Sequence, residues 1–195
     1  ISAVPVTESP EEMGDKGMKE LLEDYYGRND EEFFRYMEEN VEKIKAHDLD
    51  VLKHLIYRSC AIKAEVVGID EKEAGLRAIL NYGHTFGHAI EKLTHYDMFT
   101  HGIAVSLGMR VAARAAVLLN KISAEEEARQ NKLLDDLGFP KTYNIDVEGA
   151  WNAMAVDKKA EKGTRVYILP TKIGAVEKVV NIDKAIVDKS WDAIR

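Results

Sequence analysis

One segment of the chain reads RAILNYGHTFGHAIE from Arg77 to Glu91, and a second, FTHGIAVSLGM, runs from Phe99 to Met109. Together they hold three of the six histidines in the sequence. His84 and His88 are four residues apart, so they point to the same side if this segment is an α-helix. His101 comes thirteen residues after His88, at the start of an apolar run. We expect a helix, a short loop and a second helix that brings His101 back beside the first pair.

The three histidines are candidate ligands of a metal ion. Neutral imidazoles bind Zn²⁺ and similar ions, and three protein ligands with an open position are typical of a catalytic zinc centre. The same spacing also fits helix-face histidines that have ordinary hydrogen-bond partners. Arg77 and Asn81 extend the polar stripe at helical spacing; arginine suits a phosphate or carboxylate, and asparagine suits a hydroxyl or carbonyl. Such a stripe within an apolar segment favours a pocket over a core.

The composition excludes several classes of protein. The formal net charge of −7 argues against nonspecific binding to nucleic acid or to anionic membranes, because both need a basic face. No apolar run reaches the roughly 20 residues of a membrane span, and the N-terminal residues ISAVPV lack the features of a signal peptide. Cys60 is the single cysteine, which fits a reducing cytoplasm. No glycine-rich dinucleotide- or phosphate-binding motif is present.

Hydrophobic periodicity predicts a mainly α, multi-helix domain with a small β-hairpin near the C-terminus. We expect one domain over residues 1–195, with residues 1–8 as an extended lead-in. Cys60 falls within an apolar helical pattern and is expected to be buried. Helices are predicted over residues 9–26, 30–44, 48–67, 77–91, 101–120, 123–137, 147–154 and 182–194, and the hairpin strands over 165–169 and 175–180. Capping boxes at Ser9 and Ser123 support two of the helix starts.

The sequence resembles 3-dehydroquinate synthase, the sugar-phosphate cyclase of the shikimate pathway. The resemblance is carried by RAILNYGHTFGHAIE with the HG-AV--GM pattern after it, and it extends from about Gly17 to the C-terminus. It includes KAEVV from Lys63, DEKEAGLR from Asp70, DKK from Asp157 and LPTKIG from Leu169. Several separate motifs in the right order are far more specific than any one of them.

The resemblance implies a reaction and its cofactors. The family enzyme converts 3-deoxy-D-arabino-heptulosonate 7-phosphate to 3-dehydroquinate, using NAD⁺ and a divalent metal, usually Zn²⁺. Its N-terminal domain binds the dinucleotide, and its helical C-terminal domain carries metal ligands. This chain is similar to the second domain only, so NAD is expected to bind to a domain outside this sequence. We therefore expect the isolated chain to be inactive, with a sugar phosphate as its small-molecule partner and a homodimer as a common family arrangement.

The resemblance also implies roles for individual residues. His84 and His101 match the two histidine metal ligands, and Glu20 is the best match to a glutamate ligand upstream. The positions that match substrate-contacting residues are Lys63, Arg77, Asn81, His88 and one of Lys158 and Lys159. Judged without the resemblance, Lys63 would be an ordinary surface lysine.

Two substitutions depart from the family pattern. Glu23 stands where the family has a lysine three residues after the glutamate ligand, and a carboxylate there would repel an anionic substrate. Ile103 stands where the family has a glutamate two residues after His101, which removes a carboxylate beside a metal ligand. The alternatives are therefore a domain of a related sugar-phosphate cyclase, or a non-catalytic helical scaffold that has lost metal and substrate.

Overall fold

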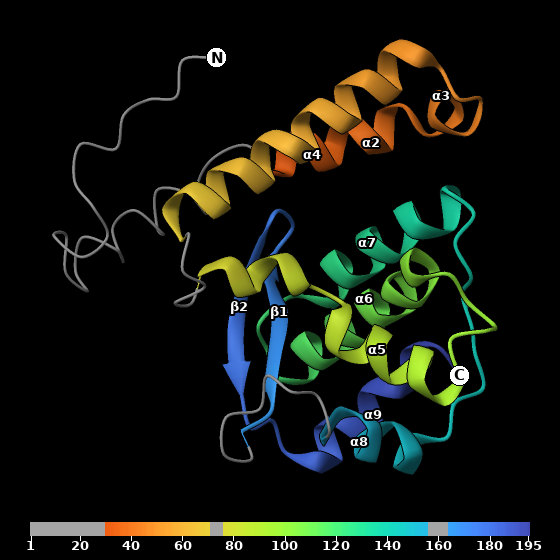
Figure 1. Cartoon of the computed structure of the whole chain (residues 1–195), viewed down its shortest axis with the longest axis vertical. Coiled ribbons are helices and arrows are strands. Elements are labelled where there is room, and N and C mark those ends of the chain that lie inside the picture. The colour runs from red at the N-terminus through yellow and green to blue at the C-terminus, as the bar shows by residue number, and fades with distance from the viewer. Residues whose placement is uncertain (1–29, 71–75, 156–163) are drawn as a thin grey trace, which may run out of the picture.

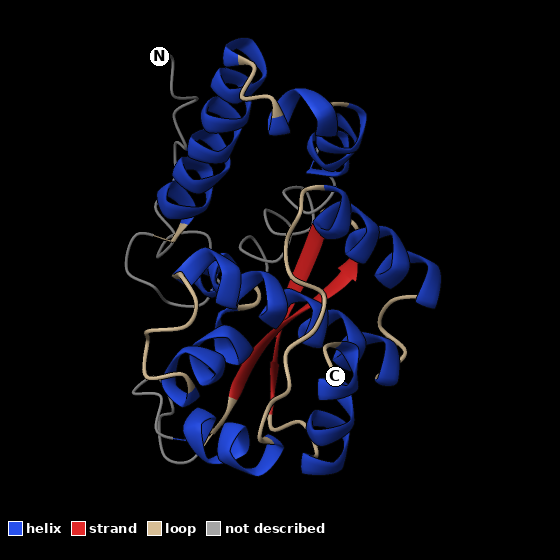
Figure 2. Ribbon diagram, turned by 90° about the vertical axis from the view of Figure 1, so that its right-hand side faces the viewer, coloured by secondary structure: helices blue, strands red, loops and turns tan. Residues whose placement is uncertain are grey.

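The structure is a computed structural model that describes residues 30–70, 76–155 and 164–195. It is mainly helical with a two-stranded antiparallel hairpin near the C-terminus, which confirms the expected fold class (Figures 1 and 2). The α-helices are α2 (Asp30–Glu39), α3 (Val41–Lys45), α4 (Leu49–Ile69), α5 (His84–Leu93), α6 (His101–Leu118), α7 (Ala124–Asp136), α8 (Val147–Ala155) and α9 (Lys184–Ser190). The 3₁₀-helices are η1 (Leu76–Asn81) and η3 (Trp191–Ala193), and the strands are β1 (Val166–Lys172) and β2 (Ala175–Val180).

Helix α6 is the centre of the fold. It contacts α5, α7, α9, β1 and η3, and its alanines form much of the buried core. Among the described residues it is also the one helix whose length and apolar composition would suffice to cross a membrane. Here it is enclosed by the other elements, and its buried Arg110 pairs with Asp135 of α7 at 2.7 Å. These are the properties of a core helix, which passes the same test of length and composition.

Glycines let α5 approach α6 at backbone distance. A Cβ atom on Gly108 would lie 2.1 Å from the carbonyl oxygen of Gly83 and 2.6 Å from the amide nitrogen of Gly87. Gly83 has a left-handed φ of 79°, a conformation that glycine adopts readily. A Cβ atom there would meet Met109 Cγ at 2.6 Å. Gly83 and Gly87 therefore meet Gly108 of α6 at a distance that leaves no room for a side chain on Gly108.

The C-terminal hairpin and η3 also pack against α5. The buried ring of Phe86 lies 5.7 Å from that of Tyr167 in β1 and 5.3 Å from that of Trp191 in η3, between ring centroids. The Thr85 hydroxyl donates a hydrogen bond to the Val166 carbonyl at 3.1 Å. These contacts fix α5 in the core, while His88 on the same helix stays exposed.

Helices α2, α3 and α4 form a helical arm, residues 30–69, that lies beside the main body (Figures 1 and 2). Asp48 and Asp50 were both possible starts for this helix, and Asp48 caps α4 by accepting hydrogen bonds from the amides of Asp50 and Val51. Within the arm the Tyr36 ring lies 4.3 Å from that of His54. The α4 end of the arm contacts η1, so the arm ends next to the segment that leads into α5.

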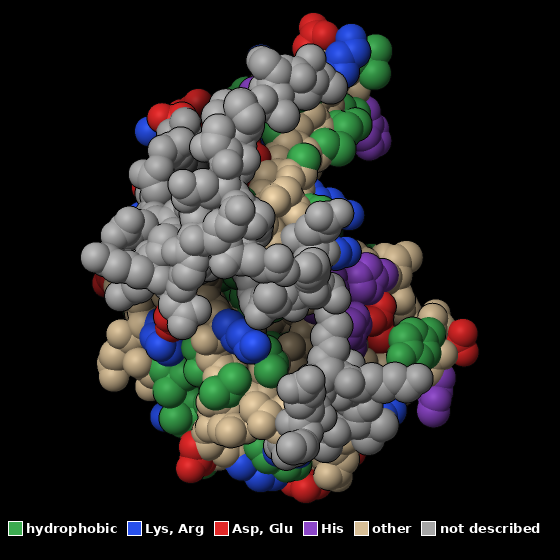
Figure 3. Space-filling model, turned by 60° about the vertical axis from the view of Figure 1, so that its left-hand side comes forward, with side chains coloured by type: hydrophobic (Ala, Val, Ile, Leu, Met, Phe, Trp, Pro, Cys, Tyr) green, Lys and Arg blue, Asp and Glu red, His purple; other side chains and the backbone are tan. Residues whose placement is uncertain are grey.

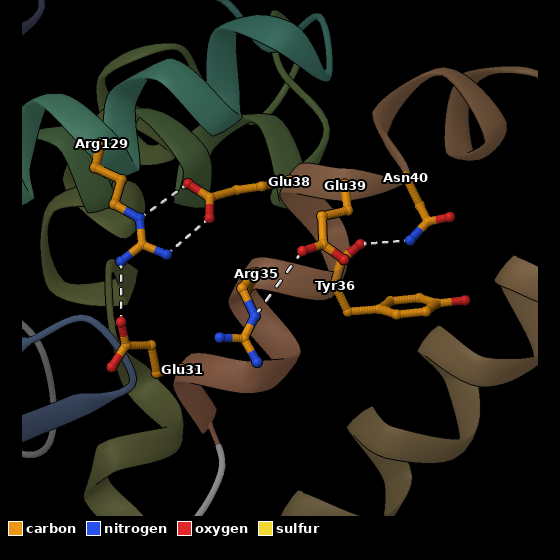
Figure 4. Close-up of polar contacts among 7 residues, drawn as sticks. All are labelled: Glu31, Arg35, Tyr36, Glu38, Glu39, Asn40 and Arg129. Carbon is orange, nitrogen blue, oxygen red and sulfur yellow. Dashed lines mark hydrogen bonds and ion pairs between the residues drawn. The ribbon is translucent and has the colours of Figure 1, made fainter.

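Arg129 of α7 joins the other side of the arm to the body. Its guanidinium donates to both carboxylate oxygens of Glu38, at 3.0 and 2.7 Å, and to Glu31 at 3.1 Å (Figure 4). It also lies 5.2 Å from the ring centroid of Phe34. Two parallel hydrogen bonds to one carboxylate fix orientation as well as distance, so this cluster sets how α2 sits on α7.

Several local expectations are wrong in detail. Residues 77–91 do not form one helix, because η1 is a 3₁₀-helix and Gly83 interrupts the path before α5. With about three residues per turn, Arg77 and Asn81 do not share a face. The helix expected from Asp30 breaks at Asn40. Cys60 is exposed, because the arm buries only part of α4. The lead-in over residues 1–8 and the helix over 9–26 lie outside the described residues.

We expect Gly108→Ala to destabilise the fold strongly. The added methyl group would enter the backbone contact with Gly83, which cannot move as a flexible side chain could. The expected loss is about 3 kcal/mol or more in the free energy of unfolding, the upper end of overpacking costs. Urea denaturation measures it. Gly102→Ala in the same helix is the control, since its Cβ would meet nothing within 4 Å; an equal loss in both variants would contradict the packing argument.

We expect Arg129→Met to loosen the arm. The change removes three hydrogen bonds to Glu31 and Glu38 and should cost on the order of 1 kcal/mol, as for partly exposed ion pairs. Hydrogen exchange should speed up at amides of α2 more than at amides of α6. The matched control is Arg35→Met, which removes an exposed pair with Glu39 at 3.9 Å inside α2. Equal exchange in the two variants would show that Arg129 does not hold the arm.

Candidate metal centre

The structure brings the three predicted histidines together. The ring centroids of His84 and His101 are 5.1 Å apart, those of His84 and His88 are 5.5 Å apart, and those of His88 and His101 are 5.9 Å apart. Two imidazoles that bind one tetrahedral zinc through bonds of ~2.1 Å have ring centres about 5 Å apart. His84, His88 and His101 therefore lie at separations that suit binding to one metal ion.

Oxygen acceptors determine which ring nitrogen of two histidines carries the proton. Nδ1 of His84 lies 3.2 Å from the carbonyl oxygen of Tyr82, and Nδ1 of His101 lies 2.9 Å from Oε1 of Glu91. A carbonyl or carboxylate oxygen only accepts, so each imidazole donates from Nδ1, and in the neutral ring the lone pair is then on Nε2. Metal-binding histidines in proteins have this arrangement, in which the second nitrogen is held by an oxygen.

Burial keeps the His84 imidazole neutral. It lowers the pKa of His84 below its ordinary value, and the neighbouring His101 and His88 rings lower it further. The Tyr82 carbonyl and the Glu91 carboxylate act in the opposite direction but do not outweigh burial. Since a metal ligand must be unprotonated, this environment suits metal binding at neutral pH.

Tyr82 is itself anchored. Its hydroxyl donates a hydrogen bond to Gln130 of α7, and burial raises the pKa of this hydroxyl well above its ordinary value, so it stays protonated. The residue thus ties the start of α5 to α7 through its side chain while its carbonyl orients His84.

Glu91 was not among the predicted site residues. It is 6% exposed and lies on α5 three residues after His88 and seven after His84, so it shares their helix face. Its carboxylate, His88 and His101 offer ligand atoms that all lie within 4.8 Å of one another, in the part of the chain that the structure describes. The sequence did contain a signal that could have identified Glu91 as a site residue: an acidic residue at helical spacing from both histidines of RAILNYGHTFGHAIE.

The remaining predicted residues come from neighbouring elements. Arg77 and Asn81 are half-buried on η1, directly before α5, and the Arg77 amide donates to Asp70 Oδ2 at 2.9 Å. Lys63 is exposed on α4, the arm helix that contacts η1. Histidine side chains gather on one face below the arm, beside acidic side chains and with Lys or Arg side chains next to them (Figure 3). Glu20, Glu23, Lys158 and Lys159 lie outside the described residues.

Known proteins resemble this chain in sequence. Residues 17–160 match the family described as 3-dehydroquinate synthase C-terminal. The chain is 47% identical over 149 residues to a 3-dehydroquinate synthase of Acetivibrio thermocellus, covering 75% of this chain and 41% of the relative. It is 42% identical over 189 residues to that of Vibrio atlanticus, covering 95% and 52%. The chain thus spans about half the length of the curated relatives it matches.

Solved structures share the fold. ValA, a 2-epi-5-epi-valiolone synthase of Streptomyces hygroscopicus with NAD⁺ and Zn²⁺ bound, matches with a TM-score of 0.74 and 19% identity, over 94% of this chain and 51% of that one. A 2-deoxy-scyllo-inosose synthase in complex with carbaglucose-6-phosphate, NAD⁺ and Co²⁺ matches with a TM-score of 0.63 and 23% identity, over 73% and 42%. The fold, the order of motifs and the match over residues 17–160 agree, and this chain belongs to the 3-dehydroquinate synthase family, whose C-terminal part it matches.

Proposed function

We propose that this chain is the metal- and substrate-binding part of a 3-dehydroquinate synthase, acting on 3-deoxy-D-arabino-heptulosonate 7-phosphate. The observation that carries the proposal is the cluster of His84, His88 and His101 at metal-sharing separation in a chain of this family. The reaction would occur in the cytoplasm and release phosphate, and NAD would bind to a separate domain.

The residues present fit a divalent metal, with zinc the first candidate. His84 and His101 would bind it through Nε2, because their Nδ1 atoms are held by oxygen acceptors. Glu20, from outside the described residues, would complete the ligand set. When bound, the metal would supply a positive charge that polarises a hydroxyl or ketone oxygen of the substrate.

The chain's own cations would hold the anionic substrate. Arg77 suits a phosphate or carboxylate, and Lys63 with Lys158 or Lys159 would add positive charge around the same ligand. Asn81 would bind a hydroxyl, and His88, exposed beside the metal-binding pair, is placed to exchange protons with solvent or substrate. Their joint action would be to hold the substrate in a reactive geometry, which is a large part of catalysis.

Two alternatives rest on particular residues. A related sugar-phosphate cyclase would use the same metal cluster and differ in its substrate contacts. A non-catalytic scaffold is favoured by Glu23 and Ile103, but a carboxylate, that of Glu91, still lies beside His101, 2.9 Å from its Nδ1. Among the alternatives, an active member of the family is therefore the better supported reading. Pairing into a homodimer would be compatible with each of them.

Zinc binding by the isolated chain tests the metal site. After dialysis against Zn²⁺ and then against buffer, about one zinc per chain should remain, measured by mass spectrometry. His84→Ala and His101→Ala should each lose it, because each removes an imidazole ligand. The control is His95→Asn, at an exposed residue with a φ of 53° that asparagine tolerates. No retained zinc in the unchanged chain, or equal zinc in His84→Ala, would contradict the proposed site.

Transplanting the chain tests the reaction. We expect this chain to support turnover when it replaces the matched part of the Acetivibrio thermocellus relative, with NAD⁺ and Zn²⁺ present, and to show none in isolation. Phosphate release measures the rate. In the chimaera, Arg77→Ala should lower kcat/KM about 10- to 100-fold, the cost of a charge-assisted hydrogen bond. Arg195→Ala is the control, since Arg195 pairs at the surface with Asp192. A folded, zinc-loaded chimaera without turnover would favour the scaffold alternative.

A further inference from the structure

Glu91 is a buried carboxylate whose side chain reaches the metal cluster. It is 6% exposed, and its Oε1 lies 2.9 Å from Nδ1 of His101. Burying a carboxylate costs free energy unless it is paired. The contact with His101 offsets that cost and explains why the side chain lies there. His101 itself is exposed and is the first residue of α6.

The separation indicates a hydrogen bond and not two ligands of one ion. Two ligand atoms bound to a tetrahedral zinc at ~2.1 Å lie about 3.4 Å apart. The distance of 2.9 Å between Nδ1 and Oε1 is that of a normal N–H···O hydrogen bond. The proton therefore lies on Nδ1, and the carboxylate touches the ring on the side away from Nε2.

The same residue holds both ends of the loop between α5 and α6. Its carbonyl oxygen accepts the amide of Tyr96 at 2.8 Å and the hydroxyl of Thr94 at 3.2 Å, which turn the chain out of α5. Its carboxylate holds His101, the first residue of α6. Since α5 is fixed to the core through Phe86, Glu91 connects the ring of His101 to a rigid element.

We propose that Glu91 is a positioning residue: it fixes the Nδ1–H tautomer and the orientation of His101, and so presents Nε2 to the metal. The proposal rests on the proposed function for the use of that nitrogen.

The tautomer of His101 in the metal-free chain is the direct test. Long-range ¹H–¹⁵N correlation spectra at about pH 8, where histidine is neutral, should show a protonated Nδ1 and an unprotonated Nε2. Glu91→Ala should convert His101 to a mixture of tautomers. Glu91→Gln should keep the Nδ1–H form, because its amide oxygen still accepts, and thereby rescue the tautomer without the charge. A predominantly Nε2–H form in the unchanged chain would overturn the proposal.

Zinc affinity separates positioning from direct ligation. In competition with a chelator, Glu91→Ala should weaken zinc binding by about 10- to 100-fold, as loss of a carboxylate behind a metal-bound histidine does, and Glu91→Gln should weaken it less. Loss as complete as in His101→Ala would overturn the proposal in favour of a direct ligand, and unchanged affinity would overturn it as well.

A buried carboxylate elsewhere provides the matched control. Glu127 of α7 is 3% exposed and pairs with Arg114 at 2.9 Å. Glu127→Gln should lower stability without changing the His101 tautomer or the zinc affinity. If substitutions at Glu127 and at Glu91 changed the tautomer and the zinc affinity equally, Glu91 would contribute only to stability, and the proposal would be overturned. If the unchanged chain shows the Nδ1–H form but binds no zinc, the proposed function fails while the positioning of His101 by Glu91 stands.

Discussion

The backbone contact between α5 and α6 is the constraint on which the site depends. At Gly108 the two helices approach so closely that a single methyl group would lie 2.1 Å from a carbonyl oxygen of the other segment. The first turn of α5 carries His84, and α6 begins with His101. Larger side chains at Gly83, Gly87 or Gly108 would separate the helices and move the two rings out of the range in which one metal ion can bind both. The glycines would thus support the proposed metal site by setting the distance between the two helices, and not through any contact with substrate.

Close approach alone would not make the histidines good ligands. Each ring also needs its proton on a defined nitrogen, and the oxygens of Tyr82 and Glu91 provide this for His84 and His101. Both oxygens belong to residues that are fixed to the core, Tyr82 through Gln130 and Glu91 through its place on α5. The cluster is therefore pre-oriented in the absence of an ion, which lowers the conformational cost of binding one.

Three of the proposed substrate contacts lie on other elements than the histidine cluster. Lys63 is carried by the arm, and Arg77 and Asn81 by η1. The arm meets the body through η1 at one end and through the Arg129 cluster of α7 along α2. A polar attachment of this kind is weaker than the apolar packing around α6. Lys63, the proposed substrate contact on the arm, is thus held less firmly than the histidines proposed to bind metal.

The sequence by itself determined the family and most local structure. Apolar periodicity predicted α6, the Ser123 capping box predicted the start of α7, and alternation predicted the hairpin, because these features depend on neighbours two to four residues apart. The histidine cluster was also predictable, since a fixed helix face and a short loop leave few other arrangements. Only the tertiary structure decided that the chain from Arg77 to His88 is broken at Gly83, because there the backbone turns with a left-handed φ of 79° against α6, where an added Cβ would lie 2.6 Å from Met109 Cγ. It also decided that Glu91 meets His101, because a contact across a loop depends on the path of that loop and on which helix the core has fixed in place.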